Sequence, residues 1–260
     1  MNPSVSRYAQ PVDAGVVLVT GGSRGIGAAV ARRLGQFGRR VCISYHVDAE
    51  SAGAVVAEVT ASGGEAIAVQ ADMVQPDDIE RLFTTVDREL GTLGGLVNNV
   101  GILETQCRVD EMDAVRLQRI MTTNIVGYFL CAGHAVRRMS TAHGGAGGAI
   151  VNVSSAASRL GSAGEYVDYA ASKGAVDTLT IGLSREVAGE GIRVNAVRPG
   201  FIDTGIHASG GEPGRVARLA PSLPMKRGGR PEEVAEAILW LLSDEASYVT
   251  GSFIDLAGGR

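Results

Sequence analysis

Short apolar runs alternate with amphipathic stretches almost throughout the chain. Most of the runs are rich in Val and Ile and lack strict polar alternation, which is typical of strands buried on both faces. The runs predict strands at residues 16–20, 40–45, 65–71, 94–99, 147–153, 191–197 and 252–256. The stretches between them predict helices at residues 26–38, 50–62, 76–90, 112–139, 169–189 and 231–243.

Local signals support these boundaries. Pro76 and Pro231 each precede two acidic residues, as expected for the first turn of a helix. Gly63-Gly64 and Gly191 follow other apolar repeats as helix stop signals. Repeated β-α units predict an α/β fold: a doubly wound parallel sheet of about seven strands with helices on both faces. Because no Pro- or Ser-rich linker divides residues 1–260, we expect a single domain with a loosely held N-terminus at residues 1–14.

Composition narrows the class of protein. The formal net charge is −4, from 24 basic and 28 acidic residues without a basic block, which argues against nucleic-acid binding. We find neither the apolar core of a signal peptide nor an apolar run of membrane-spanning length, and therefore expect a cytoplasmic protein without a membrane partner. The 3 cysteines and 4 histidines are too scattered for a disulfide framework or a metal site.

The turn after the first predicted strand is rich in glycine. Gly21, Gly25 and Gly27 have the spacing G-x-x-x-G-x-G, where a buried strand should end and a helix begin. A turn this tight needs residues that tolerate positive φ, and a backbone without Cβ lets a pyrophosphate approach closely. The helix start would aim free N–H groups and its positive dipole end at that group. Such turns are common, so the motif alone does not decide the function.

Polar residues follow the next central strands, at the sheet edge where α/β proteins bind ligands. Asp72 could accept a hydrogen bond from an adenine amino group, or be an ordinary aspartate at a strand end. Asn98–Gly101 could bracket a cofactor, or simply form a turn. Ser154-Ser155 ends the fifth strand, where a hydroxyl could bind a substrate oxygen or cap the backbone.

Tyr169 and Lys173 give the sharpest chemical signal. Helix positions i and i+4 share a face, so the phenol and the ammonium can converge on one site. A tyrosine pKa of about 10 is too high for acid–base catalysis at neutral pH, and a nearby fixed cation would lower it. Tyr166 has no such partner, because Ala170 lies four residues later. Asn124, inside the predicted helix, could hold a relay water or bond to another helix.

Together these motifs resemble the short-chain dehydrogenase/reductase family, over residues 16–259. Thr20–Gly27 resembles its TGxxxGxG motif, Asn98–Gly101 its NNAG motif, and Arg198–Gly200 its PG motif. The resemblance implies a Rossmann-type fold and hydride transfer between nicotinamide and a carbonyl compound or secondary alcohol. The implied catalytic residues are Asn124, Ser155, Tyr169 and Lys173.

The same resemblance implies a role for each of these residues. Tyr169 exchanges the proton, Ser155 positions the substrate oxygen, and Asn124 anchors a relay water. Lys173 lowers the tyrosine pKa and holds the ribose. The implied cofactor contacts are Gly21, Ser23, Arg24, Gly25, Ile26, Gly27, His46, Asp72, Met73, Asn98, Val100, Gly101, Tyr169, Lys173, Pro199, Gly200, Ile202 and Thr204.

The chain departs from the family pattern in two places. Val100 replaces the alanine of NNAG. Ser155 and Tyr169 are 14 residues apart (169 − 155), one more than in most relatives, which leaves Ser154 and Ser158 as lesser candidates for the serine. The Tyr-to-Lys spacing of four disfavours the enoyl-reductase branch, in which that spacing is wider.

The end of the second strand favours NADP(H), with NAD(H) as the alternative. An acid there would accept from the ribose 2′-hydroxyl and repel a 2′-phosphate, but residues 43–46 contain none and the next acid is Asp48. Arg24 could pair with a 2′-phosphate, unless it is solvated or salt-bridged.

Residues 203–230 follow the PG motif and, by the resemblance, form the loop that covers a small-molecule substrate. The polar content of this loop, including His207 and Glu212, leans towards a hydrophilic substrate. The nearest likeness is to glucose 1-dehydrogenase-like and 3-oxoacyl-carrier-protein reductase-like members. Apolar stretches at 112–139 and 169–189 could form the interfaces of a homodimer or homotetramer, or the core. The alternative is a non-catalytic NADP(H)-binding sensor or scaffold, although such proteins typically lose the tyrosine or the lysine.

Overall fold

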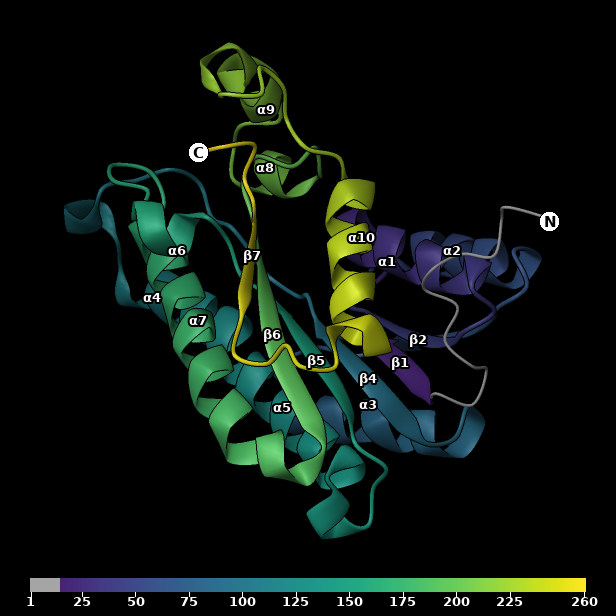
Figure 1. Ribbon diagram of the computed structural model, residues 1–260. Coiled ribbons are helices and arrows are strands. Elements are labelled where there is room, and N and C mark those ends of the chain that lie inside the picture. The colour runs from purple at the N-terminus through teal and green to yellow at the C-terminus, as the bar shows by residue number, and fades with distance from the viewer. Residues whose placement is uncertain (1–14) are drawn as a thin grey trace.

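The seven predicted strands form one parallel sheet in a computed structural model that describes residues 15–260. The strand order is β3-β2-β1-β4-β5-β6-β7, so the chain reverses its direction of travel between β1 and β4 (Figure 1). The strands are β1 Val16–Val19, β2 Arg40–Tyr45, β3 Glu65–Gln70, β4 Leu93–Asn98, β5 Gly148–Val153, β6 Ile192–Pro199 and β7 Phe253–Leu256. The predicted doubly wound sheet is confirmed, and the expectation for residues 1–14 lies outside the described residues.

Helices cover both faces of this sheet (Figure 1). One face carries α1 Gly25–Gln36, α2 Ala49–Ala61 and α10 Pro231–Leu242, and the other carries α3 Pro76–Glu89, α5 Gly127–Met139 and α7 Val167–Val187. Side chains of β1 enter two cores: Val17 and Val19 pack on the first face, and Val16 and Leu18 on the second. Alternate residues of a strand point to opposite faces, and both faces of β1 are buried, so its sequence is an unbroken apolar run.

The long helix predicted at 112–139 is divided in the structure. Helix α4 spans Ala114–Met121, a π-helical turn spans Thr122–Val126, and α5 follows. The apolar pattern continues through the π turn, so periodicity could not reveal it. Such turns occur often at functional sites.

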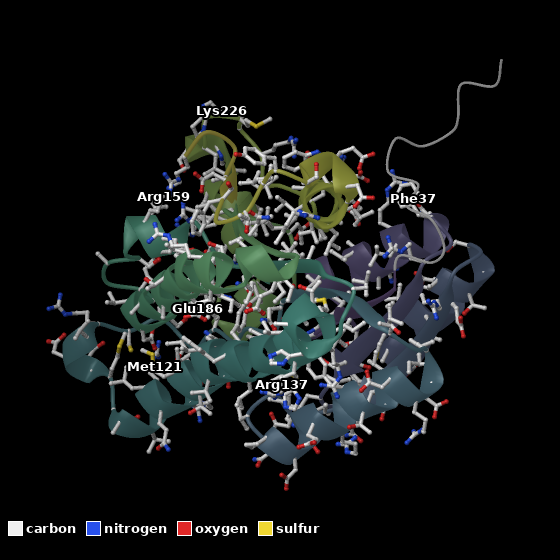
Figure 2. All side chains as sticks on the ribbon, turned by 60° about the horizontal axis from the view of Figure 1, so that its bottom comes forward. Phe37, Met121, Arg137, Arg159, Glu186 and Lys226 are labelled. Carbon is white, nitrogen blue, oxygen red and sulfur yellow. The ribbon has the colours of Figure 1, made fainter. Side chains whose placement is uncertain are left out.

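Three short helices were not predicted. Helix α6 Ala157–Leu160 follows β5, while α8 Ile206–Ser209 and α9 Arg215–Leu219 lie beyond the carboxyl ends of the strands (Figure 1). We call residues 203–230, which contain α8 and α9, the lid. Arg159 of α6 and Lys226 of the lid lie at the same end of the molecule (Figure 2). Single 3₁₀ turns occupy Val109–Glu111, Thr141–His143, Ala188–Glu190, Ala220–Ser222 and Asp244–Ala246.

Among residues 15–260, no helix has the length and apolar character needed to cross a membrane.

Candidate active site

A cleft of about 1040 Å³ lies between the carboxyl ends of the strands and the lid. Its wall contains most of the predicted site residues, although they come from distant parts of the chain. These are Gly21, Ser23, Arg24, Gly25, Ile26, His46, Asp72, Met73, Val100, Gly101, Ser155, Tyr169, Lys173, Pro199, Gly200, Ile202 and Thr204. Gly27, Asn98 and Asn124 lie behind the wall.

The glycine turn places the start of α1 at the cleft. Gly21 has φ +65° and Gly25 has φ +56°, a conformation in which other residues are strained. A Cβ on Gly21 would lie 2.9 Å from Val100 Cγ2. Helix α1 has no acidic residue in its first turn, and the side chain of Arg24 does not cap it. The first N–H groups of an uncapped helix are unsatisfied, so this turn fits a phosphate.

Gly27 has a packing role in the same turn. A Cβ on Gly27 would lie 2.4 Å from the Gly21 carbonyl oxygen and 2.7 Å from Asn99 Nδ2. The absence of a side chain therefore lets α1 sit against the turn. This close contact, and not a place on the cleft wall, accounts for glycine at this position.

The structure distinguishes the two asparagines that follow β4. Asn98 is buried and its Nδ2 donates to Tyr128 O at 3.3 Å and to Asn152 Oδ1 at 3.2 Å, away from the cleft. Asn99 lines the cleft, and its Nδ2 donates to the carbonyls of Thr20 at 2.9 Å and Gly21 at 3.1 Å. The prediction named Asn98, but Asn99 is the residue that braces the glycine turn. The motif alone cannot say which of two adjacent side chains faces the cleft.

Ser155, Tyr169 and Lys173 meet on one wall, from the end of β5 and the first turns of α7. The Lys173 Nζ lies 5.7 Å from the centre of the Tyr169 ring. It donates to Val153 O at 2.8 Å and to the Tyr128 hydroxyl at 3.2 Å, and the side chain is 2% exposed. Burial lowers the pKa of Lys173 to about 7, although the charge of Asp177 opposes the shift.

The pKa of Tyr169 is shifted opposite to the expected direction. Burial raises it above its usual value, and a hydrogen bond with the Ser155 side chain offsets part of the shift. The Lys173 ammonium is bonded to Val153 and Tyr128, and desolvation of the phenol dominates. The phenol is therefore protonated at neutral pH in this structure.

The two alternative serines, Ser154 and Ser158, form hydrogen bonds with groups other than Tyr169. Ser154 is 2% exposed, and its hydroxyl donates to Asp177 Oδ1 at 2.6 Å. The Ser158 hydroxyl donates to the Ser155 carbonyl at 2.8 Å. Among these three serines, Ser155 alone bonds with Tyr169 through its side chain. The longer separation from Tyr169 is accommodated by α6 and the turns that follow it.

Asn124 lies in the π turn and is fully buried. Its Oδ1 accepts from Ile102 N–H at 2.8 Å, and its Nδ2 donates to Ile102 O at 3.0 Å and to Ser172 Oγ at 3.1 Å. Both N–H bonds of the amide are therefore used. The side chain fixes the loop after β4 against α7, and it is not on the cleft wall where a relay water was expected.

Charged groups of both signs lie at the far end of the cleft, near the end of β2. Arg24 is exposed and, within residues 15–260, its guanidinium forms no hydrogen bond or ion pair. Asp48, the first acid after the second predicted strand, also lines the cleft. It caps α2, and its carboxylate accepts from Ser51 N–H at 2.9 Å. The bonds from Ser51 lower the pKa of Asp48, and the charge of Arg24 adds to the effect. Asp72 accepts from Val74 N–H at 3.2 Å.

Polar contacts that the sequence did not suggest hold the lid over the cleft. Arg215 of α9 bonds to Glu165, which precedes α7, and to Glu212 Oε2 at 2.8 Å. Gln106 Nε2 donates to Glu212 at 2.9 Å, and the Tyr166 hydroxyl donates to Gly210 O at 3.1 Å. Arg215 lines the cleft, and its side chain is 7% exposed.

A buried ion pair adjoins Tyr169 and was also missed. Arg116 Nε donates to Asp168 Oδ2 at 2.7 Å, and Asp168 Oδ1 accepts from Tyr169 N–H at 2.8 Å. Arg116 Nη1 donates to Thr105 O at 2.6 Å. The pair therefore ties α4, the loop after β4 and the start of α7 together. Its partners are 52 residues apart, so no local signal could have found it.

Comparison with known proteins agrees with this geometry. A family model described as Enoyl-(Acyl carrier protein) reductase matches residues 21–260. An uncharacterized oxidoreductase, YgfF, of Escherichia coli (strain K12) is 60% identical over 94% of this chain and 99% of its own. A solved short chain dehydrogenase from Burkholderia cenocepacia J2315, in complex with NADP, is 31% identical, with a TM-score of 0.87 over 96% of this chain and 99% of its own. The chain belongs to the short-chain dehydrogenase/reductase family.

Other members share about two fifths of the sequence. Cis-4-hydroxycyclohexanecarboxylate dehydrogenase of Sinomonas cyclohexanicum is 41% identical over 94% of this chain and 95% of its own. Glucose 1-dehydrogenase 2 of Bacillus subtilis (strain 168) is 36% identical over 93% of each chain. The predicted family, and within it the likeness to glucose 1-dehydrogenases, is confirmed.

Proposed function

We propose that this protein is an NAD(P)-dependent oxidoreductase that interconverts a carbonyl compound and its secondary alcohol. The observation that carries the proposal is the meeting of Ser155, Tyr169 and Lys173 on a cleft that also holds the uncapped start of α1. One part of the cleft supplies a proton donor beside a hydroxyl, and the other fits a dinucleotide phosphate. Enoyl reduction is disfavoured, because Lys173 follows Tyr169 by four residues.

The dinucleotide would lie along the cleft. The turn at Gly21–Ile26 would hold its pyrophosphate, Asp72 its adenine end, and Lys173 its ribose. Pro199, Gly200, Ile202 and Thr204 would border the nicotinamide. When bound, the nicotinamide supplies or accepts the hydride.

The residues of this chain account for the proton. Burial raises the pKa of Tyr169, so the phenol carries the proton that a carbonyl oxygen would accept, although the raised pKa weakens it as an acid and the bond with Ser155 opposes the rise. The Ser155 hydroxyl bonds with Tyr169 and would bind the same oxygen. The Lys173 ammonium, anchored on Val153 and Tyr128, would gain its ribose partner without changing position.

We propose a preference for NADP(H). Arg24 is an exposed cation at the cleft, and residues 43–46 carry no acid to repel a 2′-phosphate. The solved relative in complex with NADP supports the choice. Asp48 caps α2 through Ser51 and therefore already has partners.

We also propose a homodimer or homotetramer. Large apolar side chains are exposed on neighbouring helices: Val115 of α4 is 67% exposed, Phe129 of α5 is 53% exposed, and Ile181 of α7 is 38% exposed. Helices α5 and α7, which carry the labelled Arg137 and Glu186, run side by side across this face (Figure 2). Exposed apolar groups of this kind mark association surfaces. Light scattering of the native protein and of Phe129→Asp tests the assignment, and an unchanged mass would contradict it.

The function is tested by mixing the purified protein with NADPH or NADH and a broad set of ketones, diketones and oxoacyl thioesters, and following the nicotinamide absorbance. Sugars and other alcohols are tested in the reverse direction. Tyr169→Phe should lower kcat by about 10²- to 10⁴-fold and weaken NADPH binding far less. Tyr248→Phe, at a fully exposed tyrosine, is the matched control. Turnover that survives Tyr169→Phe would refute the assigned roles, and tight NADPH binding without any turnover would favour the sensor or scaffold.

A further inference from the structure

We infer that the substrate is a carbonyl compound, or its secondary alcohol, with an apolar body, and that a polyhydroxylated sugar does not fit the lid side of the cleft. The inference rests on the proposed function, whose reacting oxygen would lie at Ser155 and Tyr169. It concerns the part of the cleft beyond these residues, between the lid, α6 and the loop after β4.

Apolar side chains from five separate segments line this part of the cleft. They are Leu103 from the loop after β4, Leu160 from α6, Phe201 after β6, Ile206 from α8 and Leu219 from α9. Leu103 is 9% exposed and packs under Gly210 of the lid. A wall built from so many segments surrounds a ligand on several sides, and each apolar contact favours a ligand that leaves water there.

Most polar atoms of the buried side chains in the same part of the cleft already have partners within residues 15–260, and His207 Nδ1 is the exception. The Tyr166 hydroxyl donates to Gly210 O at 3.1 Å, and the His207 Nε2 lies 3.0 Å from Ile202 O. Arg215 is shared between Glu165 and Glu212. A substrate hydroxyl could bond to Tyr166 or Arg215 only by breaking a bond that closes the lid. Within the described part of the chain, His207 Nδ1 offers one free buried nitrogen, which is fewer than the several hydroxyls of a sugar would need.

The polar content of the lid, from which a hydrophilic substrate was predicted, has another explanation. Glu212 binds Gln106, Arg215 and Arg218, and it is not on the cleft wall. The hydroxyls of Ser162 and Ser209 form no hydrogen bond within residues 15–260, and both line the cleft. Ser209 is exposed and Ser162 partly exposed, so these two groups lie where water reaches them. The wall can therefore accept polar groups at its rim and one at His207, but not several along its length.

The experiment compares pairs of substrates that differ in one group. With NADPH or NADH, 4-methylcyclohexanone is compared with 4-hydroxycyclohexanone, and 2-pentanone with 5-hydroxy-2-pentanone. A hydroxyl buried without a partner should lower kcat/KM by about 5- to 150-fold relative to the methyl compound. Oxidation of glucose, which is the polyhydroxylated test compound, should be slower than oxidation of 4-methylcyclohexanol.

Two lid variants test whether the wall causes the preference. Ile206→Thr places a hydroxyl on the wall and should reduce the methyl-to-hydroxyl ratio at least threefold. Val216→Thr makes a similar change on α9 at a residue that does not line the cleft, and it should leave the ratio unchanged.

The outcomes separate this inference from the proposed function. Hydroxylated ketones or glucose turned over as well as the apolar compounds would overturn the inference and leave the function standing. Turnover confined to polyhydroxylated compounds outside both pairs would do the same. No turnover that depends on Tyr169 with any compound would refute the proposed function, and the inference with it.

Discussion

Asp168→Asn should destabilise the fold by about 3–5 kcal/mol, because it breaks a buried ion pair and leaves one charge behind. The Asp168 side chain is 1% exposed and that of Arg116 is 11% exposed. One carboxylate oxygen accepts from Arg116 and the other from Tyr169 N–H. An asparagine has only one oxygen, so one of the two bonds is lost in either orientation of the amide. Within residues 15–260, Arg116 Nη2 is already buried without a partner, and the remaining bond from Nη1 to Thr105 O offsets only part of the cost.

Urea unfolding measures the loss, which corresponds to a fall in Tm of roughly 10 °C. The control is Asp110→Asn, which breaks the Arg108–Asp110 pair at 3.0 Å, where the side chains are 71% and 69% exposed. Exposed pairs contribute only about 0–1 kcal/mol. The double variant Arg116→Met/Asp168→Leu should recover most of the stability, because it leaves no unpaired charge. Equal losses for Asp168→Asn and Asp110→Asn would refute the reasoning.

Three further predictions concern the cofactor, a buried charge and the glycine turn. Arg24→Ala should weaken NADPH binding about 10- to 100-fold and leave NADH binding nearly unchanged, as a lost charge-assisted bond implies; equal losses in a fluorescence titration would contradict this. The pKa of Lys173 falls from 10.5 to about 7 on folding, so between these values the unfolded chain binds more protons. The free energy of unfolding without dinucleotide should therefore rise with pH over this window, by at most about 1.4 kcal/mol per pH unit. Urea unfolding at pH 7 to 9 measures this rise, and Lys173→Met should abolish it. Gly27→Ala should lower the Tm, because its Cβ would lie 2.4 Å from a carbonyl oxygen. The control Gly53→Ala has no atom within 4 Å of its Cβ and should stabilise α2 by about 0.5–1 kcal/mol. A higher Tm for Gly27→Ala than for Gly53→Ala would refute this reasoning.

The strands could be predicted because their signal is local. The run at Val16–Val19 is apolar without a break, since its side chains enter cores on both faces of the sheet. The short helices α8 and α9 gave no such signal, because a helix of one turn shows no period. The π turn at Thr122–Val126 was also hidden, as one extra residue in a turn does not interrupt an apolar pattern.

The site could be predicted as a set of segments but not as a network of contacts. The spacing of Tyr169 and Lys173 placed both side chains on one wall, where the structure also has them. The direction of the Tyr169 pKa shift depends on burial, which no spacing expresses. The pairing of Glu212 with Arg215 and Gln106 depends on how the lid folds back. Such contacts join residues far apart in the chain and follow from the packing of the whole fold.

The polar contacts between the lid and the rest of the molecule have a consequence for exchanging the lid. Residues 203–230 lie between β6 and α10, so a segment from a relative could be spliced in there, provided that Thr204, which lies next to Gly25 of the glycine turn, is kept. The graft would, however, face Gln106 and Glu165, which bind Glu212 and Arg215 of the present lid. Left without their partners, these two side chains would oppose closure. Three stretches of the chain, around 106, around 165 and across the lid, therefore form one transferable unit, and a chimera should move them together.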